Sequence, residues 1–419
     1  MNIDHNYKKI YIYFWSFGLI NNVLYVVILV AAIDIVKIRL PKSIVLLADI
    51  LPSFIIKIAS PFFIDRIKYS NRIWCLILLS CIGMYLVSQK SVLVSLLGIC
   101  LTSLSSGFGE TTFLQLTHYY RHTSLNGWSS GTGAAGLVGS SVYMLLTSIL
   151  KFSPRQTLLL FSIMPFAFLL YFKLDDRNYT LADSTNDNIN IESTNEILLL
   201  DEEENERCDT GHPSLLLDPP DLQFRLDCLK LEFLRTVEKL KPLFVPYMLP
   251  LSIVYLFEYL INQAVSPTLL FPINETENLH FYHSYRDLYV LYGTLYQCGV
   301  FISRSTASYF RFKKLFLLSY LQGFNFLLAI IQSWYFIIKT PWILMILILY
   351  EGLIGGSSYV NTFMNILEDV EPQKIEFSLG ATSIADSSGI FFAALIGLML
   401  EPELCRHQVN DGRPWCQLE

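Results

Sequence analysis

The ionisable side chains that lie within long apolar stretches of the sequence are Asp49, Lys57, Glu110, Glu258, Arg304, Glu351 and Asp386. Burying one such charge at the middle of a bilayer costs about 2.5–3.5 kcal/mol. Left unpaired, the whole set would cost roughly 20 kcal/mol, which exceeds the stability of a typical fold. We therefore expect these side chains to pair with one another or to face a water-filled cavity.

Glu258 lies in the most informative local pattern. In "YLFEYLINQAV", residues 255–265, its carboxylate comes one helical turn before Asn262, an amide that offers both donors and an acceptor to a polar solute. A carboxylate that is desolvated there can carry a proton near neutrality, whereas a neighbouring Lys or Arg favours its charged form. We therefore interpret Glu258 and Asn262 as part of a path for a solute or for protons.

The other charges admit two interpretations. As a hypothesis, Glu258 and Glu351 handle protons or a cationic group, while Lys57 and Arg304 hold an anionic group. Buried Glu–Lys or Glu–Arg pairs can instead be structural pins between helices, and for any single residue this alternative carries equal weight.

Three further acids complete the set. Glu110, near the end of its apolar run, is a candidate gate pin, and Asp386 is assigned to the same path. For Asp49 we expect a structural role.

The composition indicates a membrane protein with many spans. The chain has 419 residues, of which 53% are hydrophobic and 16% charged, and its mean hydropathy is +0.44. A spanning helix needs about 20 apolar residues, and about eleven such runs follow one another. The first is expected to be a retained signal anchor. The runs are roughly residues 10–33, 43–64, 73–89, 91–117, 127–150, 156–173, 243–266, 287–310, 315–337, 341–366 and 375–400.

A polar segment divides these runs into six and five. Residues 174–240 hold 17 Asp and Glu against 6 Lys and Arg, a composition typical of disorder, but the end of this segment has apolar residues at helical spacing. This helix is expected to lie on the membrane face or on the protein's own bundle. The predicted organisation is a six-helix bundle (1–173), an acidic disordered cytosolic loop (174–221), an amphipathic helix (222–241), a five-helix bundle (242–400) and a tail (401–419).

The basic residues of short loops predict a cytosolic N-terminus. "DRIKYSNR" (65–72) and "RFKK" (311–314) then lie in the cytosol together with the acidic loop. The glycosylation acceptor Asn274-Glu-Thr falls in the lumen, as expected for such a site. Lys37, Arg39 and Lys42 are the exceptions, because this topology places them in the lumen. The tail is also lumenal, where Cys405 and Cys416 form either a disulfide or two free thiols.

Short matches suggest that the two halves share one design. Leu-Ile-Asn occurs at 19–21 and again at 260–262, so that Asn21 corresponds to Asn262 and is assigned to the same path. Chance is the alternative, because apolar sequences align easily. Repeated halves with a midplane site between them are typical of major-facilitator-type transporters. Small residues crowd 128–141 and 378–390, which favours either helices that rock past one another or static tight packing.

Most of the membrane segments resemble the battenin family, the lysosomal and vacuolar membrane proteins of juvenile ceroid lipofuscinosis. The resemblance implies a major-facilitator-like fold and a link to vacuolar or lysosomal pH balance, basic amino-acid transport and clearance of glycerophosphodiesters. It also matches Glu258, Lys57, Arg304 and Glu351 to polar positions of the family's membrane core. The motifs that carry it include "GLINNVLYVVILVAAIDI" (18–35), "ADILPSFIIKIASPF" (48–62), "SSGFGETTFLQLT" (105–117), "YLFEYLINQ" (255–263) and "LYEGLIGGSSYVNTF" (349–363).

Together these features predict an all-α transporter of the vacuolar or lysosomal membrane that works by alternating access. Its expected partners are the bilayer, a small polar or cationic solute and protons, with no nucleic acid. Without a Walker loop, HExxH or nucleophile elbow in the sequence, we expect no enzyme activity, cofactor or metal. The alternative is a non-transporting regulator that recruits trafficking or proton-pump partners through the acidic loop.

Overall fold

The structure is a computed structural model that describes residues 2–36, 42–89, 91–174, 222–272 and 285–417 of the chain. Every regular element in these ranges is a helix. The chain divides into two compact units, one of Met1–Lys173 with Leu243–Glu419 and the other of Leu174–Pro242. The larger unit contains the predicted membrane segments and the candidate site.

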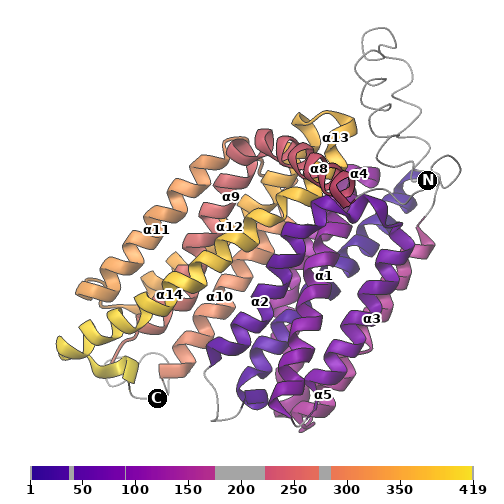
Figure 1. The fold of residues 1–419 in the computed structure, drawn as a ribbon. Helices are drawn as coiled ribbons and strands as arrows, with labels where there is room; N and C mark the ends of the chain where they lie inside the picture. Colours follow the sequence, from indigo (N-terminus) through magenta and orange to yellow (C-terminus); the bar gives the residue numbers. More distant parts are fainter. Residues whose placement is uncertain (1, 37–41, 90, 175–221, 273–284, 418–419) are drawn as a thin grey trace, which may run out of the picture. The chain divides into compact units, whose positions relative to one another are not determined.

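The N-terminal half of the larger unit consists of long apolar helices (Figure 1). Helices suit these sequences because, in a bilayer, each backbone N–H and C=O must find its partner within the segment. The elements are α1 (Asn2–Val36), α2 (Lys42–Ala59), α3 (Tyr69–Val87), α4 (Val92–Met144), α5 (Pro154–Phe161) and the 3₁₀ segment Met164–Lys173.

Helix α4 contains two helices joined without a loop. Arg121 has φ 49° and ψ −137°, which is non-helical backbone, and it separates the two parts. The two parts coincide with the apolar runs that the sequence places at 91–117 and 127–150. The two parts are therefore connected at a single residue, Arg121, where the backbone changes direction.

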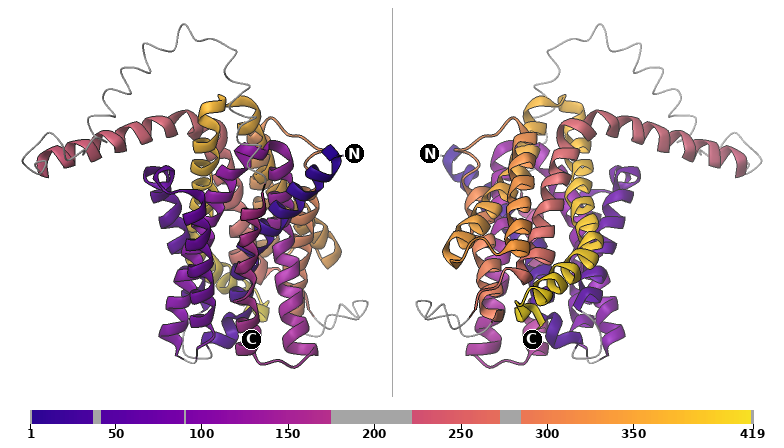
Figure 2. Two further views of the ribbon diagram at one scale, coloured as in Figure 1. Left: turned by 90° about the vertical axis from the view of Figure 1, so that its right-hand side faces the viewer. Right: turned by 90° about the vertical axis from the view of Figure 1, so that its left-hand side faces the viewer.

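Within the described residues, the C-terminal half begins with an irregular helix and continues with five further α-helices. Helix α9 (Leu249–Leu260) lies between two π-helical segments, Phe244–Met248 and Ile261–Val265. Figure 2 shows from two further sides that the helices of the larger unit run alongside one another. The remaining elements are α10 (Tyr285–Ser305), α11 (Leu315–Tyr335), α12 (Pro341–Asp369), α13 (Pro372–Thr382) and α14 (Ile384–Asn410).

Within the described residues, eight segments are long and apolar enough to cross a membrane. One of them, Val92–Thr147, contains both parts of α4. Helix α2 is not among them and carries Lys42, Asp49 and Lys57. The predicted number of about eleven spans therefore stays a prediction, while the multi-span helical architecture is present.

Each half of the larger unit has an apolar core of its own. The first core joins α1, α3, α4 and α5 through residues such as Val27, Met84 and Ile99. The second joins α10, α11, α12 and α14 through residues such as Tyr292 and Ile348. The halves contact each other through polar side chains, described below, and through apolar packing such as the stacked rings of Phe54 and Phe391. Apolar burial within each half stabilises that half.

Small residues allow the second part of α4 to approach its neighbours closely. A Cβ added to Gly131 would lie 2.0 Å from the backbone oxygen of Trp15 on α1. A Cβ added to Gly136 would lie 2.0 Å from the amide oxygen of Gln297 on α10. The stretch 128–141 therefore packs tightly on both α1 and α10.

The smaller unit contains helix α8 (Leu222–Leu243), where the sequence predicts an amphipathic helix over 222–241. The predicted acidic loop, residues 174–221, lies outside the described residues except for its first position, and Asn274 also lies outside them. In the tail, Cys405 and Cys416 form a disulfide with their Cα atoms 5.8 Å apart. This pairing is one of the two alternatives that the sequence leaves open.

Candidate functional site

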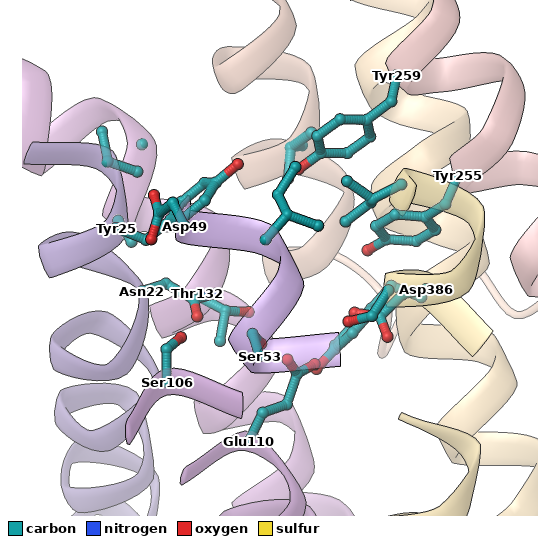
Figure 3. A pocket seen from close by; sticks show the side chains of 18 of the residues that line it. Asn22, Tyr25, Asp49, Ser53, Ser106, Glu110, Thr132, Tyr255, Tyr259 and Asp386 are labelled. Carbon is teal, nitrogen blue, oxygen red and sulfur yellow. The ribbon is translucent and has the colours of Figure 1, made fainter. Parts of the chain in front are cut away.

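A polar cavity lies between the two halves of the larger unit. It has a volume of about 150 Å³, enough for several water molecules. Its walls come from α1, α2 and α4 of the first half and from α9, α10, α12 and α14 of the second. Figure 3 shows side chains from both halves converging on this space.

Lys57 is the centre of an ion-pair network that joins the halves. Its Nζ atom lies 2.7 Å from Glu110 on α4 and 3.3 Å from Asp386 on α14, and it donates to the Ser387 hydroxyl at 2.8 Å. The Lys57 side chain is only 2% exposed. One ammonium group thus serves two carboxylates from opposite halves, which compensates part of its cost of burial.

Tyr359 on α12 connects this network to a second cation. Its hydroxyl donates to Glu110 at 2.8 Å and accepts from the Trp128 indole N–H at 3.1 Å. The guanidinium carbon of Arg304 lies 4.2 Å from the centre of the Tyr359 ring. A cation over an aromatic face at this distance is favourable, especially when desolvated.

Arg304 differs from Lys57 because it has no acidic partner. Its terminal nitrogens donate to the hydroxyls of Thr132 at 2.6 Å and Tyr255 at 2.9 Å. Within the described part of the chain, no carboxylate lies within 4.0 Å of Arg304, and its Nε atom has no hydrogen-bond partner. The cavity therefore contains a guanidinium whose charge is not balanced by an adjacent carboxylate.

Asp49 on α2 lines the same cavity and is only 2% exposed. Among the described residues, its Oδ2 atom has no hydrogen-bond partner, whereas its backbone carbonyl accepts from the Ser103 hydroxyl. Nearby, the hydroxyl of Tyr25 on α1 lies close to that of Tyr259 on α9, in the other half. The sequence favours a structural role for Asp49. Among the described residues, however, its Oδ2 atom takes part in no ion pair or hydrogen bond.

Four of the eight residues that the sequence assigns to the path line the cavity, namely Lys57, Glu110, Arg304 and Asp386. Lys57 comes from α2 of the first half and Arg304 from α10 of the second.

The other four residues of the predicted path do not line the cavity. Glu258 accepts a hydrogen bond from Tyr296, and Tyr296 is itself a lining residue. Asn262 donates to Glu351 at 2.8 Å. The Oε2 atoms of both glutamates lack a hydrogen-bond partner among the described residues. These three form a polar cluster behind the wall, reached through Tyr296.

Asn21 packs into the first half instead of facing the cavity. Its amide donates to the backbone oxygen of Ser106 on α4 at 3.1 Å, and the next residue, Asn22, lines the cavity. The sequence match with Asn262 therefore points to the residue next to the one that lines the cavity.

Five tyrosines that sequence reasoning did not single out also line the cavity. They are Tyr25, Tyr255, Tyr259, Tyr296 and Tyr359. The sequence signal for these residues was the high tyrosine content of the chain, 24 residues in all. Tyrosine in an apolar run looks like core, however, and only the fold shows where its hydroxyl points.

The family model described as "CLN3 protein" matches residues 12–407 of the chain. The chain is 58% identical to Protein BTN1 of Saccharomyces cerevisiae over 415 residues, which is 98% of either chain. It is 43% identical to Protein btn-1 of Neurospora crassa, covering 97% of this chain and 91% of the relative.

Solved structures with low sequence identity share the fold. A bacterial homologue of the iron transporter ferroportin, in an outward-facing state, has a TM-score of 0.57 at 12% identity, covering 99% of this chain and 97% of its own. The major facilitator proton:xylose symporter XylE, bound to 6-bromo-6-deoxy-D-glucose, has a TM-score of 0.56 at 10% identity, covering 98% of this chain and 92% of its own. The predicted major-facilitator-like fold is therefore confirmed.

Proposed function

The chain belongs to the CLN3 protein family, and on this premise we propose that it transports a small polar solute across the vacuolar or lysosomal membrane by alternating access. The solute classes that we propose are basic amino acids and glycerophosphodiesters, and the transport contributes to vacuolar or lysosomal pH homeostasis. The membrane assignment rests on the resemblance of the apolar segments to the battenin family.

The observation that carries the proposal is a charged cavity whose walls come from both halves. A protein that needed only stability would fill this space with apolar side chains, because a buried ion pair is often no more stabilising than well-packed hydrophobic residues. Here Lys57, Glu110, Arg304 and Asp386 all face one cavity. Charges in such a position are typical of a solute or ion path.

The contacts between the halves also suit alternating access. Lys57 with Asp386, and Glu110 with Tyr359, each join one half to the other through polar groups. Such contacts can be exchanged for water or solute when the halves rock, while the two apolar cores stay intact. The movement thus costs hydrogen bonds that water replaces at a small net cost.

We propose a more specific role for each charged residue than the hypothesis drawn from the sequence. Arg304 is the proposed ligand for an anionic group, because its guanidinium has no acidic partner within the described residues. Lys57 already holds two carboxylates, so it serves chiefly to join the halves. Glu258 supports Tyr296 at the cavity wall.

Reconstitution in liposomes tests this function. Labelled arginine and glycerophosphocholine are offered to liposomes that contain wild-type protein, Arg304→Ala, Arg304→Lys or Arg406→Ala. Arg406 is the matched control because it pairs with Glu403 on the surface and is 69% exposed.

We expect wild-type flux of one of the two solutes, a loss of that flux in Arg304→Ala, partial retention in Arg304→Lys and wild-type flux in Arg406→Ala. Wild-type flux in Arg304→Ala would remove the role of Arg304. A wild-type protein that carries neither solute would contradict the proposed solute classes.

A further inference from the structure

We propose that Asp49 binds a proton whose uptake and release are coupled to solute movement. The inference deepens the proposed transport function and rests on it. It gives Asp49 a role that the sequence alone does not suggest.

The surroundings of Asp49 differ from those of the other acids in the cavity. Glu110 and Asp386 share the ammonium group of Lys57. Asp49 has no ion pair among the described residues, and its Oδ2 atom has no hydrogen-bond donor. Yet the residue is 2% exposed and lines the cavity. An isolated buried carboxylate charge is costly, so a positive charge must reach it from the cavity.

A proton fits this position better than a metal ion. Hard cations need several oxygen ligands, at least six for Ca²⁺ or Mg²⁺. No group of three or more potential metal ligands occurs among the described His, Cys, Asp and Glu residues. Among the described residues, the titratable groups near Asp49 are Tyr25 on α1 and Cys100 on α4, with Lys57 two turns further along α2 and already paired. Such surroundings can exchange a proton through cavity water but offer no cage for a cation.

The position of Asp49 also provides the coupling. Tyr25 lies beside Asp49 (Figure 3), and its hydroxyl is close to that of Tyr259 on the other half. An ionised carboxylate accepts a hydrogen bond more strongly than a phenol oxygen does. Ionised Asp49 therefore draws the Tyr25 hydroxyl toward itself and away from Tyr259. Protonated Asp49 leaves the Tyr25 hydroxyl free to bond Tyr259 across the halves.

The test separates proton coupling from transport itself. Liposomes with wild-type protein, Asp49→Asn, Asp49→Glu or the surface control Glu403→Gln are assayed with labelled arginine and glycerophosphocholine. Exchange of solute is measured at equal pH on both sides, and net uptake is measured with and without a pH gradient. The infrared band of protonated carboxyl groups is followed in parallel during a pH titration of each protein.

We expect Asp49→Asn to keep exchange, to lose the response of net uptake to the pH gradient and to lose one titrating carboxyl component from the infrared spectrum. Asp49→Glu should retain part of the gradient response, and Glu403→Gln should behave as wild type. Asp49→Asn with a full gradient response overturns the proposal. Loss of exchange as well, in a folded variant, also overturns it, since Asp49 then holds a cationic group of the solute.

The infrared titration does not depend on flux. If the wild-type protein moves neither solute, the proposed solute classes fail, whereas the spectrum of Asp49→Asn still decides whether Asp49 binds a proton. If Asp49→Asn does not fold, the Asp49→Glu spectrum and gradient response decide instead, and an unchanged spectrum and an unchanged gradient response count against the proposal.

Discussion

Lys57 and Asp386 lie 3.3 Å apart in the structure although they are 329 positions apart in the sequence. Lys57 belongs to the first half of the larger unit and Asp386 to the last long helix of the second. With Glu110 on the other side of the ammonium group, they form a buried contact across the interface of the halves. The contribution of this contact to stability can be measured by replacing Lys57, which supplies its positive charge.

Lys57→Met should destabilise the protein by about 3–5 kcal/mol, because it leaves Glu110 and Asp386 buried without their shared cation. The measurement is thermal unfolding in detergent. Adding Glu110→Gln and Asp386→Asn to Lys57→Met should restore part of the loss. Lys374→Met is the control, since the Lys374–Glu371 pair is exposed at 65% and 70% and should contribute about 0–1 kcal/mol. Equal effects of Lys57→Met and the control would contradict the network.

Tyr359→Phe removes a hydroxyl but keeps the ring beneath Arg304. The variant should lose the hydrogen bond to Glu110, at a cost of about 1.5–3 kcal/mol for a bond to a charged group. Thermal unfolding measures this cost. In the liposome assay we expect altered flux but retained binding of the anionic group, because the ring contact with Arg304 remains. Tyr359→Leu, which removes the ring as well, should weaken both; a Phe variant as impaired as the Leu variant would show that the ring is unimportant.

Gly131→Ala should destabilise the protein by about 1–3 kcal/mol, the usual cost of overpacking. The added carbon would lie 2.0 Å from the backbone of Trp15, so the two helices must move apart. Gly293→Ala on α10 is the matched control, because nothing lies within 4 Å of its added carbon. It should stabilise its helix by about 0.5–1 kcal/mol. The two unfolding temperatures should move in opposite directions, and a shift in the same direction would argue against the close contact.

Cys405→Ser should destabilise the folded tail by about 3 kcal/mol, the amount expected for a short closed loop. Mass spectrometry after alkylation without a reductant checks the pairing itself. Wild-type protein should show no alkylation at Cys405 or Cys416, and reduction should expose both. Alkylation of both before reduction would mean that they are free thiols.

Deleting residues 180–215 should leave solute flux in liposomes unchanged if the chain is a transporter, because the cavity is built from other segments. A regulator that recruits partners through this acidic stretch would instead lose its cellular effect while any flux persisted. Comparing vacuolar pH in cells that express the full chain or the deletion variant gives the second readout.

Much of the fold was predictable because a bilayer permits few alternatives. Apolar runs about 20 residues long must be helices, and Lys57 and Arg304 had to find water or partners. The face that each helix turns toward the cavity was not predictable in the same way, because most spans are apolar on every side. The sequence therefore pointed to Asn21, whereas its neighbour Asn22 lines the cavity. It also pointed to Glu258, whereas the hydrogen-bond partner of Glu258, Tyr296, lines the cavity. The role proposed for Asp49 could not be predicted from the sequence, because it depends on which groups the other helices leave out of reach of its carboxylate.

The separate apolar cores of the two halves have a thermodynamic consequence. In the proposed alternating-access cycle each core would keep its contacts when the halves tilt, and the polar groups that join the halves would trade protein partners for water, each at about 0.5–1.5 kcal/mol. The two orientations can therefore be nearly isoenergetic. In that case the binding energy of one small molecule or proton suffices to change which orientation is favoured.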